Sequence, residues 1–270
     1  PVRWSARAGR AVGELLRACG FDLDFAPVVD LDRGQLGNAL DGRCVGRDTR
    51  AVSARGRAFL EGLASRGIAG CLKHFPGLGG ASVDTHREGA PIGLSRRQLA
   101  RDLRPFRDLA AFAPAVMAGH AAYPAWDPSG RPATLSRPIA TGLLRREVGF
   151  RGLLFGDDLE MGALAGHGGL AERAEEALAA GCDALLVCSE LGEAGEIARR
   201  LDQPHLARHR ARAQRRWLRL RAAIEALQRS APATPSRGEA TRRLHDLAAA
   251  VARAQNGMSS SPGPGSPPSS

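Results

Sequence analysis

The run Cys71-Leu72-Lys73-His74-Phe75-Pro76-Gly77-Leu78-Gly79-Gly80 joins the end of an apolar strand to a glycine-rich loop. The strand is predicted to begin at Ile68, and it places an ammonium and an imidazole at its C-terminal end. Lys73 is the only lysine among 38 basic residues. In so Arg-rich a chain a lone lysine indicates a position that needs a compact ammonium, although chance is the simpler alternative. The run therefore predicts a polar site at the end of a buried strand.

Other parts of the chain repeat this pattern. Strands are predicted over residues 21–29, 68–73, 115–119, 152–156 and 184–187. Helices are predicted over residues 5–19, from Val52 to Leu63, from a capping box at Ser95 and Gln98, and in a second segment beginning at Pro105. Strands that alternate with helices indicate βαβ units and a parallel sheet.

Four of the predicted strands end in polar residues that could face a pocket: Asp30, Lys73 with His74, His120, and Asp157 with Asp158. This distribution is typical of a (β/α)₈ barrel, whose chemistry lies at the C-terminal ends of several strands. A closed barrel of this type needs eight strands, and the sequence pattern predicts five. We therefore expect an α/β fold, a (β/α)₈ TIM-type barrel that lacks its first strands.

The C-terminal third is helical and basic. The barrel domain is predicted to cover residues 1–229 and to be incomplete at its N-terminus. Residues 230–255 are expected to form a linker and a C-terminal helix, and residues 256–270, rich in Ser, Pro and Gly, a disordered tail.

Composition excludes several classes of protein. The net charge of +10 is concentrated in the helical segment after Leu201, where it indicates a solvated helix face rather than a nucleic-acid-binding stripe. No apolar run is long enough to cross a membrane, and the N-terminus has no apolar signal region. The five cysteines show no paired metal-ligand spacing, and their odd number fits a reducing compartment.

Two groups of residues could carry out chemistry. Asp84-Thr85-His86 places a carboxylate beside an imidazole that could donate and accept a proton near neutral pH, although a hydrogen-bonded loop histidine is the simpler alternative. Asp157 stands at a predicted strand end, where helix capping is the alternative role. A cation, an imidazole and an isolated carboxylate on separate strand ends fit nucleophilic displacement at a polar carbon better than metal binding.

A set of ordered motifs resembles glycoside hydrolases of family 3, specifically the NagZ-type β-N-acetylglucosaminidases. The resemblance covers roughly residues 5 to 200 and rests on Phe25–Asp30, Lys73–Gly77, Asp84 with His86, Ala118–His120 with Tyr123-Pro124, Leu143–Gly152, Phe155–Met161 and Ala179–Cys188.

The resemblance implies a retaining β-N-acetylhexosaminidase that acts on N-acetylglucosamine-containing muropeptides during cell-wall recycling. Asp157 matches the family nucleophile, His86 the acid/base catalyst and Asp84 its polarising partner. Lys73, His74 and Arg43 match residues that contact the sugar. No metal or organic cofactor, nucleic acid or membrane is expected, and the protein is expected to be a cytoplasmic monomer.

Departures from the family keep other interpretations open. Family members carry two further strands upstream that contribute an aspartate and an arginine to the sugar site, Leu78 stands where they commonly have His, and Arg43 follows Asp41-Gly42 instead of Gly-Asp or Gly-Glu. A catalytically silent or vestigial sugar-binding fragment is therefore the alternative. A β-glucosidase is less favoured because those enzymes usually take the acid/base carboxylate from a second domain, and a nucleic-acid binder is the most remote alternative.

Overall fold

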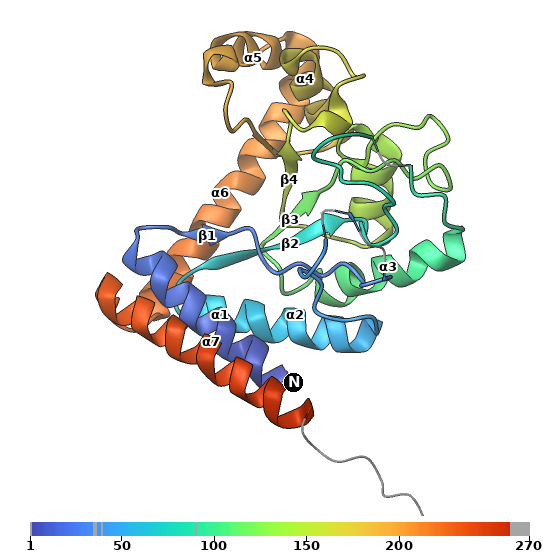
Figure 1. The fold of residues 1–270 in the computed structure, drawn as a ribbon. Helices are drawn as coiled ribbons and strands as arrows, with labels where there is room; N and C mark the ends of the chain where they lie inside the picture. Colours follow the sequence, from blue (N-terminus) through green and yellow to red (C-terminus); the bar gives the residue numbers. More distant parts are fainter. Residues whose placement is uncertain (1, 35–36, 39, 90, 260–270) are drawn as a thin grey trace, which may run out of the picture.

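The structure, a computed structural model of the chain, describes residues 2–34, 37–38, 40–89 and 91–259. Within these residues, five parallel strands form one sheet in the order β1-β2-β3-β4-β5, with helices around it (Figure 1). The strands are β1 (Leu23–Asp24), β2 (Ala69–Phe75), β3 (Ala115–Ala118), β4 (Leu153–Asp158) and β5 (Ala184–Leu186). The helices are α1 (Val2–Ala18), α2 (Thr49–Ala64), α3 (Arg96–Leu109), α4 (Leu170–Ala180), α5 (Ala194–Leu201), α6 (Ala207–Ser230) and α7 (Arg237–Ser259). Sheet order follows chain order, which confirms the predicted α/β class with an open part-barrel sheet.

One face of the sheet packs against the helices that connect its strands. Leu72, Val116 and Leu154 point into a large apolar core that also contains residues of α2 and α3. The rings of Phe75 and Phe106 meet edge to face there, with their centroids 5.3 Å apart. The Ser95–Gln98 capping box is present and starts α3, as predicted.

The opposite face of the sheet is covered by α6. Because side chains alternate along a strand, Cys71, Met117 and Phe155 point away from the main core. They form a second apolar cluster with Leu220 of α6, and Ile224 packs against its edge. Figure 1 shows α6, in orange, running past the strands from the α4–α5 end of the molecule toward α7.

Polar contacts hold α6 in this position. The buried carboxylate of Asp183 accepts hydrogen bonds from Arg216 of α6 at 2.7 Å and from Arg145 at 2.6 Å. It also accepts the amide of Leu154 at 3.0 Å, so the same side chain reaches into β4. Because it is buried and has two guanidinium partners, Asp183 is a strong polar link between α6 and the sheet.

The two ends of the described chain lie side by side. Helix α7 packs along α1 (Figure 1), and Arg243 of α7 forms a 3.1 Å ion pair with the buried Glu14 of α1. Helix α1 also crosses α2 closely. A Cβ at Gly9 would lie 2.2 Å from the carbonyl oxygen of Phe59, so this crossing requires glycine.

Several predicted boundaries were wrong. The strand predicted over residues 21–29 is reduced to β1 and an isolated bridge between Val28 and Lys73, because Pro27 has no amide hydrogen to give to a ladder. Pro105 lies inside α3 instead of starting a new helix. Helix α7 continues to Ser259, past the predicted start of the tail at residue 256, and residues 260–270 lie outside the described part. No helix in the described part is both long and apolar enough to cross a membrane.

Candidate active site

The pair predicted from Asp84-Thr85-His86 is formed. The Nδ1 atom of His86 lies 2.7 Å from Oδ1 of Asp84, and the same oxygen accepts the backbone amide of His86 at 2.9 Å. These two hydrogen bonds, the backbone one first, lower the pKa of Asp84. Because a carboxylate accepts, Nδ1 carries the hydrogen, and Nε2 is left to give or take a proton. The His86 side chain is 57% exposed, so solvent or a ligand can reach it.

The loop that carries this pair is tied to the segment that follows Asp157. The amide of Gly162 donates to the carbonyl oxygen of His86 at 3.0 Å, and the amide of Ala163 donates to that of Thr85 at 3.3 Å. A Cβ at Gly162 would lie 2.2 Å from the carbonyl oxygen of Arg87, so the close approach requires glycine. The loop therefore docks against η3 (Gly162–Leu164), a short turn downstream of β4.

Lys73 lies where its charge interacts with two other predicted site residues. Burial, the larger effect, and the positive charge of Arg43 lower the pKa of Lys73. The carboxylates of Asp157 and Asp24 act in the opposite direction. Lys73, Arg43 and Asp157 are thus brought to one region, although they come from three separate segments of the chain.

His74 is buried and paired with Asp30. Its Nδ1 atom lies 2.8 Å from Oδ2 of Asp30, which also accepts the His74 amide at 3.0 Å. The other oxygen of Asp30 accepts the amide of Leu78 at 2.7 Å. Asp30 is fully buried and so holds the start of the glycine-rich loop instead of facing a pocket. Only the Nε2 atom of His74 is left for a ligand.

Asp157 and Asp158 end β4 in different roles. The Oδ1 atom of Asp157 accepts the amide of Asp158 at 2.9 Å. The side chain of Asp158 accepts the amide of Glu160 at 3.2 Å and so supports the turn after the strand. The carbonyl oxygen of Asp158 accepts from Nε2 of His120 at 2.8 Å. His120, predicted as a possible pocket residue, is 1% exposed and packs between β3 and β4.

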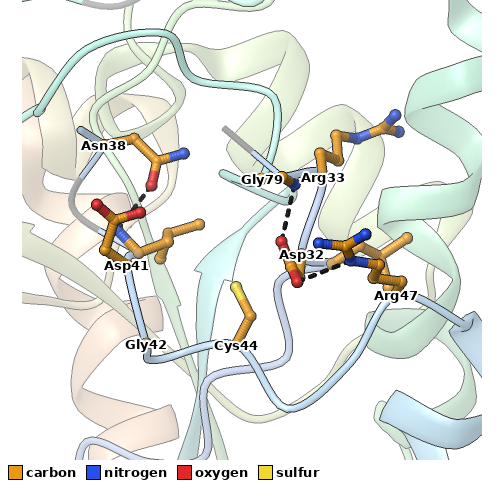
Figure 2. A pocket seen from close by; sticks show the side chains of 11 residues that line it. Asp32, Arg33, Asn38, Asp41, Gly42, Cys44, Arg47 and Gly79 are labelled. Carbon is orange, nitrogen blue, oxygen red and sulfur yellow. Dashed lines mark hydrogen bonds and ion pairs between the residues drawn. The ribbon is translucent and has the colours of Figure 1, made fainter. Parts of the chain in front are cut away.

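A cavity of about 240 Å³ lies beside this region, between the loop after β1 and Gly79 (Figure 2). Figure 2 shows Asp32 joined to Arg47 on one side of the cavity, and the side chains of Asn38 and Asp41 on the other side. Cys44 is at its base, and burial, with the nearby charge of Asp30, raises the pKa of this thiol to about 12. Among the described residues that line the cavity, none is a predicted site residue. The cavity is therefore a neighbour of the candidate site. It shares with that site the loop that carries Arg43 and, through Gly79, the glycine-rich loop after His74.

One group of described residues has the arrangement of metal ligands. Side-chain atoms of Asp158, Glu160 and Cys188 lie within 4.8 Å of one another. The Glu160 carboxylate, however, accepts three backbone amides, from Cys188 at 2.5 Å and from Ser189 and Glu190 at 2.7 Å each. This carboxylate holds the loop after β5, so the donor set fits a structural clamp better than a metal site.

Sequence reasoning missed one residue of this region and misjudged the surroundings of another. Asp24 lies near Lys73, and burial raises the pKa of its carboxyl; its position in a two-residue strand gives no signal in the sequence. His120 was predicted to face a pocket, but it is buried, and its bond to Asp158 joins segments 38 residues apart. Such a contact follows from the alignment of β3 with β4 and not from any local pattern.

Comparison with known proteins shows which family the chain is similar to. Residues 4–220 match the glycosyl hydrolase family 3 N-terminal domain. A β-hexosaminidase of Bordetella parapertussis is 41% identical over 213 residues, which cover 76% of this chain and 58% of the relative. The chain therefore spans less than two thirds of that relative's length.

Solved structures give the same result. A family 3 β-N-acetylglucosaminidase from a Paenibacillus species superposes with a TM-score of 0.82 at 30% identity, covering 92% of this chain and 49% of that one. NagZ from Neisseria gonorrhoeae, in complex with N-trifluoroacetyl-D-glucosamine, superposes with a TM-score of 0.72 at 34% identity, covering 92% and 70%. Since the family match extends over most of the chain, this protein belongs to glycosyl hydrolase family 3 and carries that family's N-terminal domain.

Proposed function

We propose that this chain carries the catalytic machinery of a retaining β-N-acetylhexosaminidase that releases terminal β-linked N-acetylglucosamine. The proposal is supported above all by the 2.7 Å contact between His86 and Asp84, in a loop tied to the turn after Asp157. The names of the similar proteins, β-hexosaminidase and β-N-acetylglucosaminidase, support the substrate class.

In the first step the Asp157 carboxylate attacks the anomeric carbon of the bound sugar. His86, protonated on both nitrogens, donates its Nε2 proton to the leaving glycosidic oxygen as the carbon–oxygen bond breaks. The Nδ1 hydrogen stays with Asp84, whose negative charge stabilises the imidazolium before transfer. The products are a glycosyl ester on Asp157 and the released alcohol.

In the second step the Nε2 atom of His86 removes a proton from a water molecule. That water attacks the anomeric carbon from the opposite face, and the ester bond to Asp157 breaks. The carboxylate and the protonated imidazole are then restored. Two successive inversions leave the sugar with its original configuration.

Three further side chains are proposed to bind the sugar. Lys73 and Arg43 present positive charge beside Asp157 and can donate to sugar hydroxyls. His74 is fixed by Asp30, so its Nε2 atom is the acceptor offered to the sugar. No cofactor enters either step.

The wider setting of the activity is also a proposal. Muropeptides from cell-wall recycling in the cytoplasm are the proposed natural substrates, and the protein is proposed to act as a monomer. Residues 1–229 would form the catalytic domain.

A chromogenic 4-nitrophenyl N-acetyl-β-glucosaminide tests the function. The chain should release nitrophenol, and NMR should show the β-anomer of the sugar as the first product. Asp157→Asn should lower kcat by at least about 1,000-fold, since loss of a nucleophile removes the covalent route. Asp202→Asn, which changes a carboxylate on α5's C-terminal side, is the matched control and should keep full activity. Equal rates in the Asp157→Asn variant and the unchanged chain would exclude Asp157 as the nucleophile.

A further inference from the structure

His120 joins the end of β3 to the end of β4, the strand that carries Asp157. It follows β3 directly, and its ring is almost completely buried, with 1% of the residue exposed. Both ring nitrogens have partners within 3.0 Å. Nε2 lies 2.8 Å from the carbonyl oxygen of Asp158, and Nδ1 lies 3.0 Å from the hydroxyl of Thr134.

The partner atoms determine which nitrogen carries the hydrogen. A carbonyl oxygen can only accept, so the Nε2 atom of His120 must donate to Asp158. Burial lowers the pKa of His120, although the negative charges of Asp157 and Asp158 oppose this effect. The ring is then neutral near pH 7, and its Nδ1 atom can only accept. The single hydrogen of the Thr134 hydroxyl therefore points toward Nδ1 and not toward the carbonyl oxygens of Ala118 and Gly119, which lie 3.1 and 2.9 Å from the same oxygen.

Thr134 contacts the ring of His120 at Nδ1, on the side away from Asp158. It lies in the short turn η1 (Ala133–Leu135) and is itself fully buried. Its amide donates to the carbonyl oxygen of Gly119 at 3.3 Å. The methyl group of Thr134 packs against Gly156, one residue before Asp157. A Cβ added at Gly156 would lie 3.0 Å from this methyl group. The ring of His120 therefore has little freedom to turn.

Asp158 connects His120 to the carboxylate of Asp157. Asp158 gives its carbonyl oxygen to His120 and its amide to the carboxylate of Asp157, at 2.9 Å. Because both groups belong to the same residue, fixing the carbonyl limits the rotation of the backbone that supports the Asp157 carboxylate.

From these contacts we infer that His120 is a positioning residue for Asp157, and that its Nε2–H group holds the end of β4 in the orientation from which the carboxylate attacks the sugar. This inference rests on the proposed function, because it concerns the nucleophile of that reaction. His120 does not touch the sugar. Its effect should appear in the formation of the covalent intermediate and not in the binding of substrate.

The first measurement is independent of activity. In protein labelled with ¹⁵N in its histidines, NMR should show the ring of His120 neutral, with its hydrogen on Nε2. A hydrogen on Nδ1 alone would overturn the inference whatever the activity of the chain.

The second measurement follows the covalent step. A 5-fluoro glycosyl fluoride of N-acetylglucosamine traps the glycosyl-enzyme, and mass spectrometry locates the labelled residue. His120→Leu keeps the volume but removes the donor, so its labelling rate should fall by about 100-fold, as expected when a reacting group is misplaced by about 1 Å. His120→Gln can present an N–H group at a similar position and should recover a large part of the rate.

Controls separate positioning from loss of folded protein. Rates are expressed per active site by titration with the same reagent, so a merely destabilised variant shows a normal rate constant at fewer sites. Ile139→Ala, a fully buried position in the π-helical segment η2 (Pro138–Glu147), is the matched destabilised control. KM for the nitrophenyl substrate should stay within about twofold in all variants, since positioning of the nucleophile acts on the chemical step.

The outcomes separate the two proposals. Absence of any label on Asp157 in the unchanged chain would contradict the proposed function. Labelling of Asp157 in the unchanged chain with an equal per-site rate in His120→Leu would overturn the positioning role alone. A fall in rate that His120→Gln partly reverses supports it.

Discussion

The backbone carbonyl of His86 accepts a 3.0 Å hydrogen bond from the amide of Gly162, five positions after Asp157. The two residues proposed to act on opposite sides of the sugar are thereby joined through main-chain atoms. Four predictions follow from this and from other contacts in the protein.

The first concerns the docking of the His86 loop. Gly162→Ala places a methyl group 2.2 Å from the carbonyl oxygen of Arg87, so the loop must move away. Displacing the general acid should lower kcat by about 100-fold for a substrate with a poor leaving group such as an alcohol. The loss in kcat should be much smaller for a dinitrophenyl substrate, because dinitrophenol leaves without a proton. Gly166→Ala is the matched control, because a Cβ there meets nothing within 4 Å. Equal losses with both leaving groups would contradict this account of the loop.

The second prediction concerns pH. Burial and Arg43 lower the pKa of Lys73, so its ammonium loses its proton at a lower pH than an ordinary lysine. The positive charge beside Asp157 is present below this pKa and lost above it. With a dinitrophenyl substrate, whose leaving group needs no proton from His86, kcat/KM should therefore fall on the alkaline side, at a pH below 10.5. Lys73→Arg should have lower activity but no such fall, since guanidinium keeps its proton. A pH profile in which both proteins share the same alkaline limb would argue against Lys73 as its source.

The third prediction concerns the buried pair of His74 and Asp30. Asp30→Asn removes the charge that accepts two backbone amides and the imidazole, and it should lower the free energy of unfolding by about 2–4 kcal/mol. Urea denaturation followed by circular dichroism measures this change. Asp32→Asn is the control, because its carboxylate is exposed and should matter little. Similar midpoints for the two variants would show that burial of Asp30 adds no stability.

The fourth prediction concerns the packing of α6 on the sheet. Leu220→Ala leaves a cavity at a 5% exposed position against the sheet face that α6 covers, and it should lower the free energy of unfolding by about 2–4 kcal/mol. Leu218→Ala, on the same helix but 57% exposed, should leave stability nearly unchanged. Thermal unfolding of both variants provides the comparison. If Leu218→Ala is as destabilising as Leu220→Ala, α6 does not cover the sheet as described.

The sequence predicted the elements of the fold well where local patterns determine them. The capping box at Ser95 formed as predicted because both of its hydrogen bonds are local. The strands β2 to β5 appear near their predicted positions because their apolar runs are bounded by polar or glycine residues. The course of α6 across the sheet face that carries Cys71, Met117 and Phe155 could not be predicted, since it depends on the long-range bond from Arg216 to Asp183.

In the candidate site, too, local contacts could be predicted and long-range ones could not. His86 and Asp84 are two residues apart, and their contact could be predicted from spacing. The burial of Asp30 and His120 could not, because polar residues at strand ends give the same pattern whether they face a cavity or pack between strands. Only the alignment of neighbouring strands separates the two cases.

The position of α6 also affects how this protein folds while it is being synthesised. The strands that carry Cys71, Met117 and Phe155 are synthesised well before Leu220 and Ile224, which cover them. During that interval the nascent chain presents an apolar sheet surface with no cover of its own. Synthesis of this chain therefore includes a period in which chaperone binding competes with aggregation, and it ends when α6 leaves the exit tunnel.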